Sequence, residues 1–261
     1  MFNVPLISVI TIVYNGFSYI EKTIQSVVSQ SNKNIEYLVI DGGSTDGTVD
    51  VIHRYDKRIS QIIVEKDQGI YDAMNKGLDR ANGDYVIFMN GGDCFASSQI
   101  LSEIFSCNSD FDFLYGDSYI NDKNKIYYKR ARPHQYAWYG MFAHHQSMIY
   151  NLRMIRRYGI KYDLSYIVAA DYKFTLEVLK YAHKVIYLST PISIFLLGGI
   201  SEKKAKIGLL ETEKARKEIR SYSWIKLILI RFILTCARFC ADNFRNLYRL
   251  MRYSNNESNC T

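Results

Sequence analysis

The first 95 residues alternate between continuous apolar runs and stretches in which apolar positions recur with helical spacing. The apolar runs predict strands buried on both faces, and they lie at residues 7–13, 37–40, 61–64 and 85–89. The helical spacing predicts three intervening helices, at residues 19–30, 48–55 and 71–81. This alternation predicts an α/β fold whose mainly parallel sheet is flanked by helices.

The pattern becomes less regular after Asp93. We expect a helix, two meandering strands, a second helix and a late strand, at residues 99–106, 113–117, 125–129, 173–181 and 184–189. A glycine-containing loop at 196–201 and a charged helix beginning near Glu202 follow.

Basic residues are concentrated near the end of the chain. The whole sequence has a net charge of +7, yet residues 203–252 contain 13 Lys or Arg and only 4 Asp or Glu. A nucleic-acid enzyme usually places its basic surface beside the active cleft, so we expect no nucleic-acid partner. The apolar runs within 222–252 are too short for a transmembrane span, which needs roughly 20 apolar residues. A basic, partly amphipathic helix on a membrane surface is expected there; packing on the rest of the chain or in an oligomer is the alternative.

The five cysteines form no CxxC pair, which favours free thiols in a reducing compartment over a zinc site. Met1–Pro5 leads into the first apolar run with no basic segment and no cleavage site. We therefore expect a cytoplasmic protein that is peripheral to the inner face of the cytoplasmic membrane.

Five carboxylates follow the predicted strands or their turns. They are Asp41, Asp46, Asp67, Asp72 and Asp93. Ligands of open α/β sheets bind outside the carboxyl ends of the strands, so these side chains are candidates for one crevice. Such a crevice repels a bare diphosphate unless a cation lies between them. The pattern therefore predicts a metal–nucleotide site.

Several motifs occur in an order that resembles the inverting transferases of glycosyltransferase family 2. They are TIVYN at 11–15, VIDGGSTDGT at 39–48, DQGIYDAMNKG at 67–77, NGGD at 90–93 and AADY at 169–172. The resemblance covers residues 6–200 and implies a GT-A, Rossmann-like fold. It implies a catalytic domain over 1–201, with a nucleotide-sugar half (1–95) and an acceptor half (96–201). Residues 202–261 would form a basic helical extension.

The resemblance also implies a set of donor-binding residues. They are Thr11, Val13, Tyr14, Asn15, Asp41, Asp67, Gly69, Asp72, Asn75, Asn90 and Gly92. Asp41 would accept a hydrogen bond from the base, whereas Asp46 is expected to support a turn and helix start. Met74 stands where many members carry arginine, which leaves Lys66 or Lys76 as diphosphate contacts.

The resemblance to this family implies that Asp93 corresponds to the metal-binding aspartate of its D-x-D-type motif. A divalent cation stabilises the charge that develops on a departing nucleoside diphosphate. Mg²⁺ or Mn²⁺ takes few protein ligands, so one carboxylate can suffice. Asn90 and Gly92 stand where other members often have aspartates, which weakens the expectation of metal dependence.

The acceptor half is expected to supply the general base. Asp171 matches the late acidic motif at the start of a helix, where it can take a proton from the acceptor hydroxyl; a helix N-cap is a second role for it. The acceptor or diphosphate side also includes His145, Gln146, Gly198, Gly199 and Ser201. For His145 a buried structural role is equally open.

These features predict a metal-dependent inverting glycosyltransferase that uses a nucleoside-diphosphate sugar, preferably a UDP-sugar. The expected acceptor is a lipid-linked or growing surface glycan, by analogy with the family and from the basic tail. A nucleotide-sugar-binding protein without catalysis is the first alternative. A sugar nucleotidyltransferase is less favoured, because residues 13–30 lack a glycine-rich basic loop. No G-x-G-x-x-G follows the first strand, which disfavours a dinucleotide oxidoreductase.

Overall fold

The computed structural model describes residues 5–108, 110–122, 125–199 and 204–219, together with residues 230, 232–233 and 235–236. Within this part of the chain, one mixed nine-stranded sheet has the order β3-β2-β1-β4-β8-β6-β9-β5, and β7 pairs with β6. The strands are β1 (Ile7–Val13), β2 (Ile35–Asp41), β3 (Gln61–Val64), β4 (Tyr85–Phe88), β5 (Cys94–Phe95), β6 (Phe113–Asp122), β7 (Lys125–Lys129), β8 (Met148–Asn151) and β9 (Val185–Leu196).

Strands β1 to β4 form the parallel half of the sheet. β1 pairs with β2 on one side and with β4 on the other, and β3 lies outside β2. The strand order therefore reverses between β1 and β4, which is where open α/β sheets leave a crevice at the carboxyl ends of their strands. The chain leaves β1 at Val13, β2 at Asp41 and β4 at Phe88, so their connecting loops meet there.

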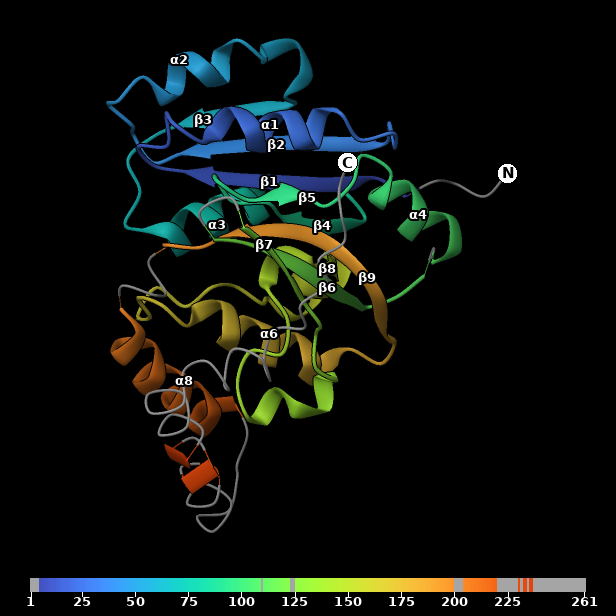
Figure 1. Ribbon diagram of the computed structural model, residues 1–261, viewed down its shortest axis with the longest axis vertical. Coiled ribbons are helices and arrows are strands. Elements are labelled where there is room, and N and C mark those ends of the chain that lie inside the picture. Colours follow the sequence, from blue (N-terminus) through green and yellow to red (C-terminus); the bar gives the residue numbers. More distant parts are fainter. Residues whose placement is uncertain are drawn as a thin grey trace.

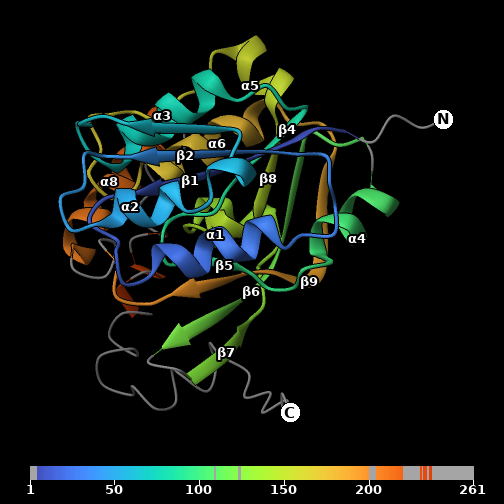
Figure 2. The same ribbon diagram turned by 90° about the horizontal axis from the view of Figure 1, so that it is seen from above.

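Helices cover both faces of the sheet. One face carries α1, α2 and α4, and the other carries α3, α5 and α6 (Figure 2). Their bounds are α1 (Ile20–Val28), α2 (Thr48–His53), α3 (Ile70–Arg80), α4 (Ile100–Cys107), α5 (Leu152–Tyr158) and α6 (Ala170–Tyr181). A further helix, α8 (Ala205–Ile219), lies beside α6 (Figure 1). The 3-10 turns are η1 (Asp56–Arg58), η2 (His134–Trp138) and η3 (His145–Ser147).

Each face has its own apolar core, because the central strands are buried on both sides. All seven residues of β1 are buried, as expected for a strand inside a parallel sheet. Gly77 lets α3 approach this strand closely. A Cβ atom at Gly77 would lie only 2.6 Å from Cγ2 of Ile10, so α3 packs directly on β1.

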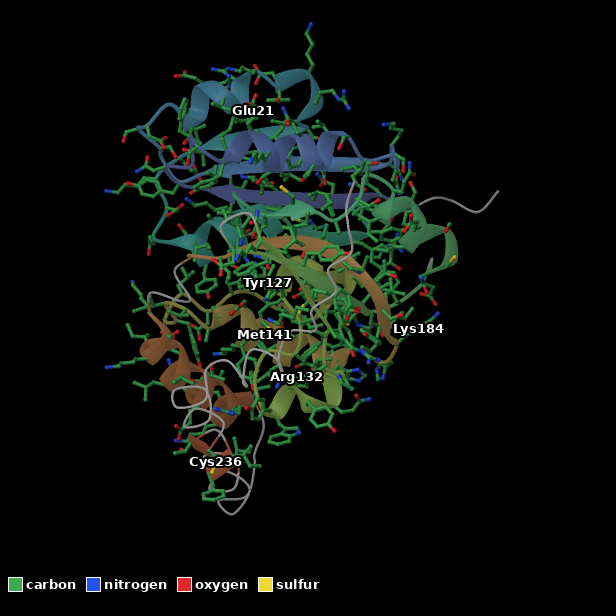
Figure 3. The ribbon with its side chains drawn as sticks, viewed as in Figure 1. Glu21, Tyr127, Arg132, Met141, Lys184 and Cys236 are labelled. Atoms are coloured by element: carbon green, nitrogen blue, oxygen red, sulfur yellow. The ribbon has the colours of Figure 1, made fainter. Side chains whose placement is uncertain are left out.

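The second half of the sheet mixes strand directions. β8 is antiparallel to β4 and to β6, while β9 runs parallel to β6. Between β7 and η3 the chain forms a compact segment in which Arg132 donates a hydrogen bond of 2.6 Å to the carbonyl oxygen of Met141 (Figure 3). This segment packs over the face of the sheet that carries α6 through Ala137 and Phe142.

The predicted α/β fold with a mainly parallel sheet in its first half is confirmed. Every helix and strand predicted before Asp93 occurs within a few residues of its predicted position. Three later elements are longer than predicted: β6 continues to Asp122, α6 begins at Ala170, and β9 continues to Leu196. β5 and α5 were not predicted because both are short. No helix in the described part of the chain combines the length and apolarity required to cross a bilayer.

Candidate active site

The end of β1 ties three parallel strands together. The buried Thr11 hydroxyl donates to the Met89 carbonyl oxygen at 2.8 Å and shares a 3.0 Å hydrogen bond with the Tyr37 hydroxyl. Val13 is also buried, whereas Tyr14, which directly follows β1, is 61% exposed. Thr11 and Val13 are therefore part of the packed interior, and Tyr14 is the residue of the three that can offer an aromatic face to a ligand.

Asn15 connects the loops after β1 and β2. Its φ of 49° is in the left-handed region, which Asn tolerates better than most residues. Its backbone N–H donates to the Ser44 hydroxyl at 2.7 Å, and its Oδ1 accepts from the Thr45 N–H at 3.0 Å. The two loops that border the predicted nucleotide site thus form one unit.

Asp41 has one occupied and one free carboxylate oxygen. Its Oδ1 accepts hydrogen bonds from the N–H groups of Gly43 (3.0 Å) and Ser44 (2.7 Å). Its Oδ2 is buried and has no hydrogen-bond partner. A buried acceptor without a partner is costly, so this oxygen is well placed to accept from a ligand N–H.

Three further carboxylates of the predicted crevice take part in local turns. Asp46 is exposed and accepts from the N–H groups of Phe17 and Thr48, at the start of α2. Asp67 accepts from the Gly69 N–H at 2.9 Å. Asp72 accepts from the Gln68 N–H and forms an ion pair of 3.4 Å with Lys76. No three carboxylates of this set form a metal-holding group in the described residues.

Asn75 is held by the second half of the chain. Its Nδ2 donates to the Tyr162 carbonyl oxygen and its Oδ1 accepts from the Tyr162 N–H, both at 2.8 Å. This pair of bonds fixes α3 against the segment that leads to α6.

The turn after β4 contains the predicted metal aspartate. Gly92 has φ of +100°, a conformation that favours glycine. Asp93 is only 5% exposed; its Oδ2 accepts from Gln146 Nε2 at 2.6 Å and its Oδ1 from the Leu196 N–H at 2.9 Å. Burial raises the pKa of Asp93 to about 7, and none of its described contacts is a cation. A buried carboxylate in this state is stabilised by a positive ion.

The donor atoms near Asp93 suit a hard divalent cation. The Asn90 Oδ1 and Gln146 Oε1 atoms are buried and have no hydrogen-bond partner. Mg²⁺ and Mn²⁺ prefer oxygen ligands of this kind. No group of three or more His, Cys, Asp or Glu residues with metal-ligand geometry occurs in the described ranges. The residues therefore fit a cation held by one carboxylate together with a bound diphosphate.

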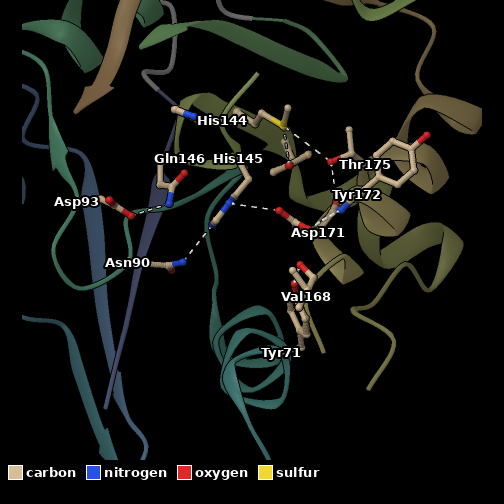
Figure 4. Close-up of polar contacts among 12 residues, drawn as sticks. Tyr71, Asn90, Asp93, His144, His145, Gln146, Val168, Asp171, Tyr172 and Thr175 are labelled. Atoms are coloured by element: carbon tan, nitrogen blue, oxygen red, sulfur yellow. Dashed lines mark hydrogen bonds and ion pairs between the residues drawn. The ribbon is translucent and has the colours of Figure 1, made fainter. Parts of the chain in front are cut away.

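His145 lies between this turn and Asp171 (Figure 4). Its Nε2 is 3.1 Å from Asn90 Nδ2, and its Nδ1 is 3.7 Å from Asp171 Oδ2. Because the Asn90 Nδ2 group that faces His145 Nε2 can only donate, this orientation of the Asn90 amide assigns the ring proton to Nδ1, which faces Asp171. Burial lowers the pKa of His145 to about 4, so the ring is neutral and the contact is polar rather than ionic. His144 has different partners, Ser118 and Lys129, as expected for adjacent histidines that point apart.

Asp171 occupies the first turn of α6, as predicted, but the N-cap role also considered for it is wrong, because Ala169 holds that position. The Asp171 Oδ1 accepts from the Tyr172 N–H at 2.8 Å. Burial is the main cause that raises the pKa of Asp171 to about 6. The Asp171 side chain is nevertheless 24% exposed, so the carboxylate can reach a ligand. These properties suit a general base that works near neutral pH.

The glycine loop after β9 borders the Asp93 turn. Gly198 has φ of +106°, and a Cβ atom at Gly198 or Gly199 would meet nothing within 4 Å. This loop directly follows Leu196, whose N–H binds Asp93. Ser201, also predicted here, lies outside the described residues.

The sequence did not reveal two contacts that shape the site. The Leu196 N–H holds Asp93, and the Tyr71 hydroxyl donates to the Val168 carbonyl oxygen just before α6. The first is a backbone contact and leaves no signal in the sequence. Tyr71 follows the DQG segment, but helical spacing indicates only a buried face for it.

The chain matches the model of the family described as glycosyl transferase family 2 over residues 8–169. It is 40% identical over 103 residues to a putative teichuronic acid biosynthesis glycosyltransferase of Bacillus subtilis, a match that covers 38% of this chain and 41% of that protein. It is 28% identical over 221 residues to an uncharacterized glycosyltransferase of Haemophilus influenzae, covering 78% and 84% of the two chains.

Solved structures share the fold at lower identity. Residues 1–349 of S. aureus TarS in complex with UDP-GlcNAc superpose with a TM-score of 0.68 at 18% identity, covering 82% of this chain and 65% of that one. The mannosyltransferase PcManGT of Pyrobaculum calidifontis in complex with GDP-Man and Mn²⁺ gives 0.64 at 16% identity, covering 85% and 66%. The family match, which spans more than half of the sequence, shows that this chain has a GT-A-like fold and belongs to glycosyltransferase family 2.

Proposed function

We propose that the chain is a metal-dependent inverting glycosyltransferase that takes a sugar from a nucleoside diphosphate. The observation that carries this proposal is the contact chain Asn90–His145–Asp171. It brings a partly exposed carboxylate of raised pKa next to the turn that contains Asp93. A leaving-group site and a proton acceptor are the two parts that a direct displacement at an anomeric carbon requires.

Uridine is the nucleoside that Asp41 suits best. Its Oδ1 is occupied by Gly43 and Ser44, which leaves Oδ2 as the one free acceptor. Uracil offers one ring N–H, whereas guanine offers a ring N–H and an adjacent amino group. Tyr14, exposed at the end of β1, can stack on the base. The two solved neighbours contain UDP-GlcNAc and GDP-Man, so the family fold accepts either nucleoside.

Asp93 is proposed as the carboxylate that holds Mg²⁺ or Mn²⁺. The bound cation supplies charge stabilisation for the departing diphosphate. Gln146 and the Leu196 N–H fix the Asp93 carboxylate, and Asn90 and Gln146 each keep one buried side-chain oxygen that has no hydrogen-bond partner. Lys76, paired with Glu65 at 3.2 Å and Asp72 at 3.4 Å, is a second source of positive charge on the donor side.

Asp171 is proposed to remove the proton from the acceptor hydroxyl as the new glycosidic bond forms. The neutral His145 directs its Nδ1 proton toward Asp171 Oδ2, which orients the carboxylate without neutralising it. The acceptor is proposed to be a lipid-linked or surface glycan, since the Bacillus subtilis relative is described as a teichuronic acid biosynthesis enzyme. Residues 1–201 are proposed as the catalytic domain and 202–261 as a basic extension.

Replacing the proposed base tests the displacement chemistry. Asp171→Asn keeps the shape of the side chain but cannot accept the proton, so turnover should fall at least 100-fold. UDP affinity, measured by calorimetry, should stay near that of the unchanged chain. Asp79→Asn, which alters an exposed carboxylate paired only with Lys161, is the matched control. Loss of UDP binding would contradict the base assignment, and UDP binding without turnover in the unchanged chain would favour a non-catalytic binder.

The pH dependence of turnover follows from the raised pKa of Asp171. The base acts only when it is deprotonated, so kcat should rise with pH and level off above a midpoint of about 6. His145, with a pKa of about 4, should add no second step in this range. The profile should be recorded at saturating donor and Mn²⁺, because a bound cation would keep Asp93, whose pKa burial raises to about 7, deprotonated over this range. A midpoint near 4, the ordinary range of an aspartate, would contradict a buried base.

Metal removal tests the role of Asp93. Treatment with EDTA should abolish release of nucleoside diphosphate, and added Mn²⁺ or Mg²⁺ should restore it. Asp93→Asn should raise the Mn²⁺ concentration needed for half-maximal rate at least tenfold, because it removes the negative charge. Asp110→Asn, on an exposed residue, serves as control. Full activity in EDTA would show that the transfer needs no metal.

Membrane attachment through residues 222–252 is proposed from their basic, apolar sequence. The full chain should co-sediment with anionic vesicles and dissociate as salt rises, because each basic residue near an anionic surface contributes about 1 kcal/mol. A chain ending at residue 220 should remain in the supernatant. Equal binding of the two chains would contradict attachment through this segment.

A further inference from the structure

Helix α8 lies outside the residues matched by the family model, yet it packs on the helix that presents Asp171. The model match ends at residue 169, and α8 covers Ala205–Ile219. Its buried Arg216 donates to the carbonyl oxygens of Trp138 (3.2 Å) and Tyr139 (3.4 Å). Its Glu218 pairs with Lys173 of α6 at 2.7 Å. The helix is thus fastened to the acceptor half at several points.

One residue of α8 binds the segment directly before α6. The Glu211 carboxylate accepts three consecutive backbone N–H groups: Ile167 at 2.7 Å on Oε1, and Val168 at 2.8 Å and Ala169 at 2.9 Å on Oε2. Ala169 is the N-cap position of α6 and has no side chain that could cap the helix. These three N–H groups lie at and before the N-cap, so Glu211 does not act as a helix cap, which binds N–H groups of the first turn. It fixes instead the backbone that leads into α6.

The same segment is also held from the opposite side. The Tyr71 hydroxyl of α3 donates to the Val168 carbonyl oxygen, so the peptide group between Val168 and Ala169 is bound at its carbonyl by α3 and at its N–H by Glu211 of α8. Gly208 favours the close approach of α8, because a Cβ atom there would lie in tight contact with Val168, 3.1 Å from its Cγ1 atom. Residues 167–169 are clamped between two helices two residues before Asp171.

From this arrangement we infer that Glu211 is a positioning residue for the transfer reaction, which sets the first turn of α6 and with it the Asp171 carboxylate. The inference rests on the proposed role of Asp171 as the base. It makes α8 part of the catalytic unit, although the family model ends before it.

The charge of Glu211 also acts on Asp171. The titratable groups that influence or contact Asp171 are His145 from η3, Tyr71 from α3, Tyr150 from β8, Tyr162 from the segment before α6, and Glu211 from α8. The tyrosines have raised pKa values and are neutral in the working range. Burial is the largest cause of the raised pKa of Asp171, and the negative charge of Glu211 raises it further.

Glu211→Gln is the variant that tests this role. In either orientation of the amide, its NH₂ group faces at least one of the three backbone N–H donors, so the clamp is weakened while the side chain keeps its shape. We expect kcat to fall roughly 10- to 100-fold, as misplacement of a catalytic group does. The acidic limb of the kcat profile should move to lower pH, because a nearby negative charge is lost. Affinity for UDP should not change.

Glu213→Gln is the matched control on the same helix, since Glu213 pairs with Lys217 at 3.1 Å and, among the described residues, has no hydrogen bond to the segment 167–169. It should leave kcat, the acidic limb and UDP affinity unchanged. The inference is overturned if Glu211→Gln has the kcat and acidic limb of the unchanged chain. It is also overturned if kcat falls together with UDP affinity and melting temperature, which indicates a general structural role. Asp171→Asn, assayed in parallel, separates the two proposals: if that variant turns over normally, the base assignment itself has failed.

Discussion

The contact of His145 with Asn90 on one side and Asp171 on the other couples the two halves of the site, because these groups come from the turn after β4 and the first turn of α6. The ring can do this only while it is neutral. A protonated His145 could not accept from Asn90, and burial keeps its pKa at about 4. The low polarity around the ring therefore preserves the geometry that relates the donor turn to the base.

The carboxylates of the site have lost contact with water, fully or in part. Asp41 and Asp93 are buried and Asp171 is partly exposed, and the three carboxylates differ in what compensates their charge. Asp41 receives two backbone N–H groups, Asp93 receives Gln146 and the Leu196 N–H, and Asp171 receives the Tyr172 N–H. Asp41, Asn90 and Gln146 each keep one buried side-chain oxygen that has no hydrogen-bond partner. A ligand can complete the hydrogen bonding at these three atoms.

The sequence predicts the first half of this molecule well, because each strand and its following turn are local features. Apolar runs identify β1 to β4, and glycines mark the turns that carry Asp41 and Asp93. Contacts between distant segments are different. Tertiary packing decides three of these contacts: Asn75 with Tyr162, Leu196 with Asp93, and Glu211 with the segment before α6. Such residues look like ordinary positions of a helix or strand, and no local pattern separates them from solvent-facing neighbours.

The central claim is that Asp171 removes the acceptor proton on the face of the sugar opposite the departing diphosphate. Such a displacement inverts the anomeric centre. Proton NMR of the disaccharide product, formed from an α-linked nucleotide sugar, measures the outcome directly. The account predicts a β-linked product from the first turnover onward. An α-linked product would show retention and would contradict the assigned role of Asp171.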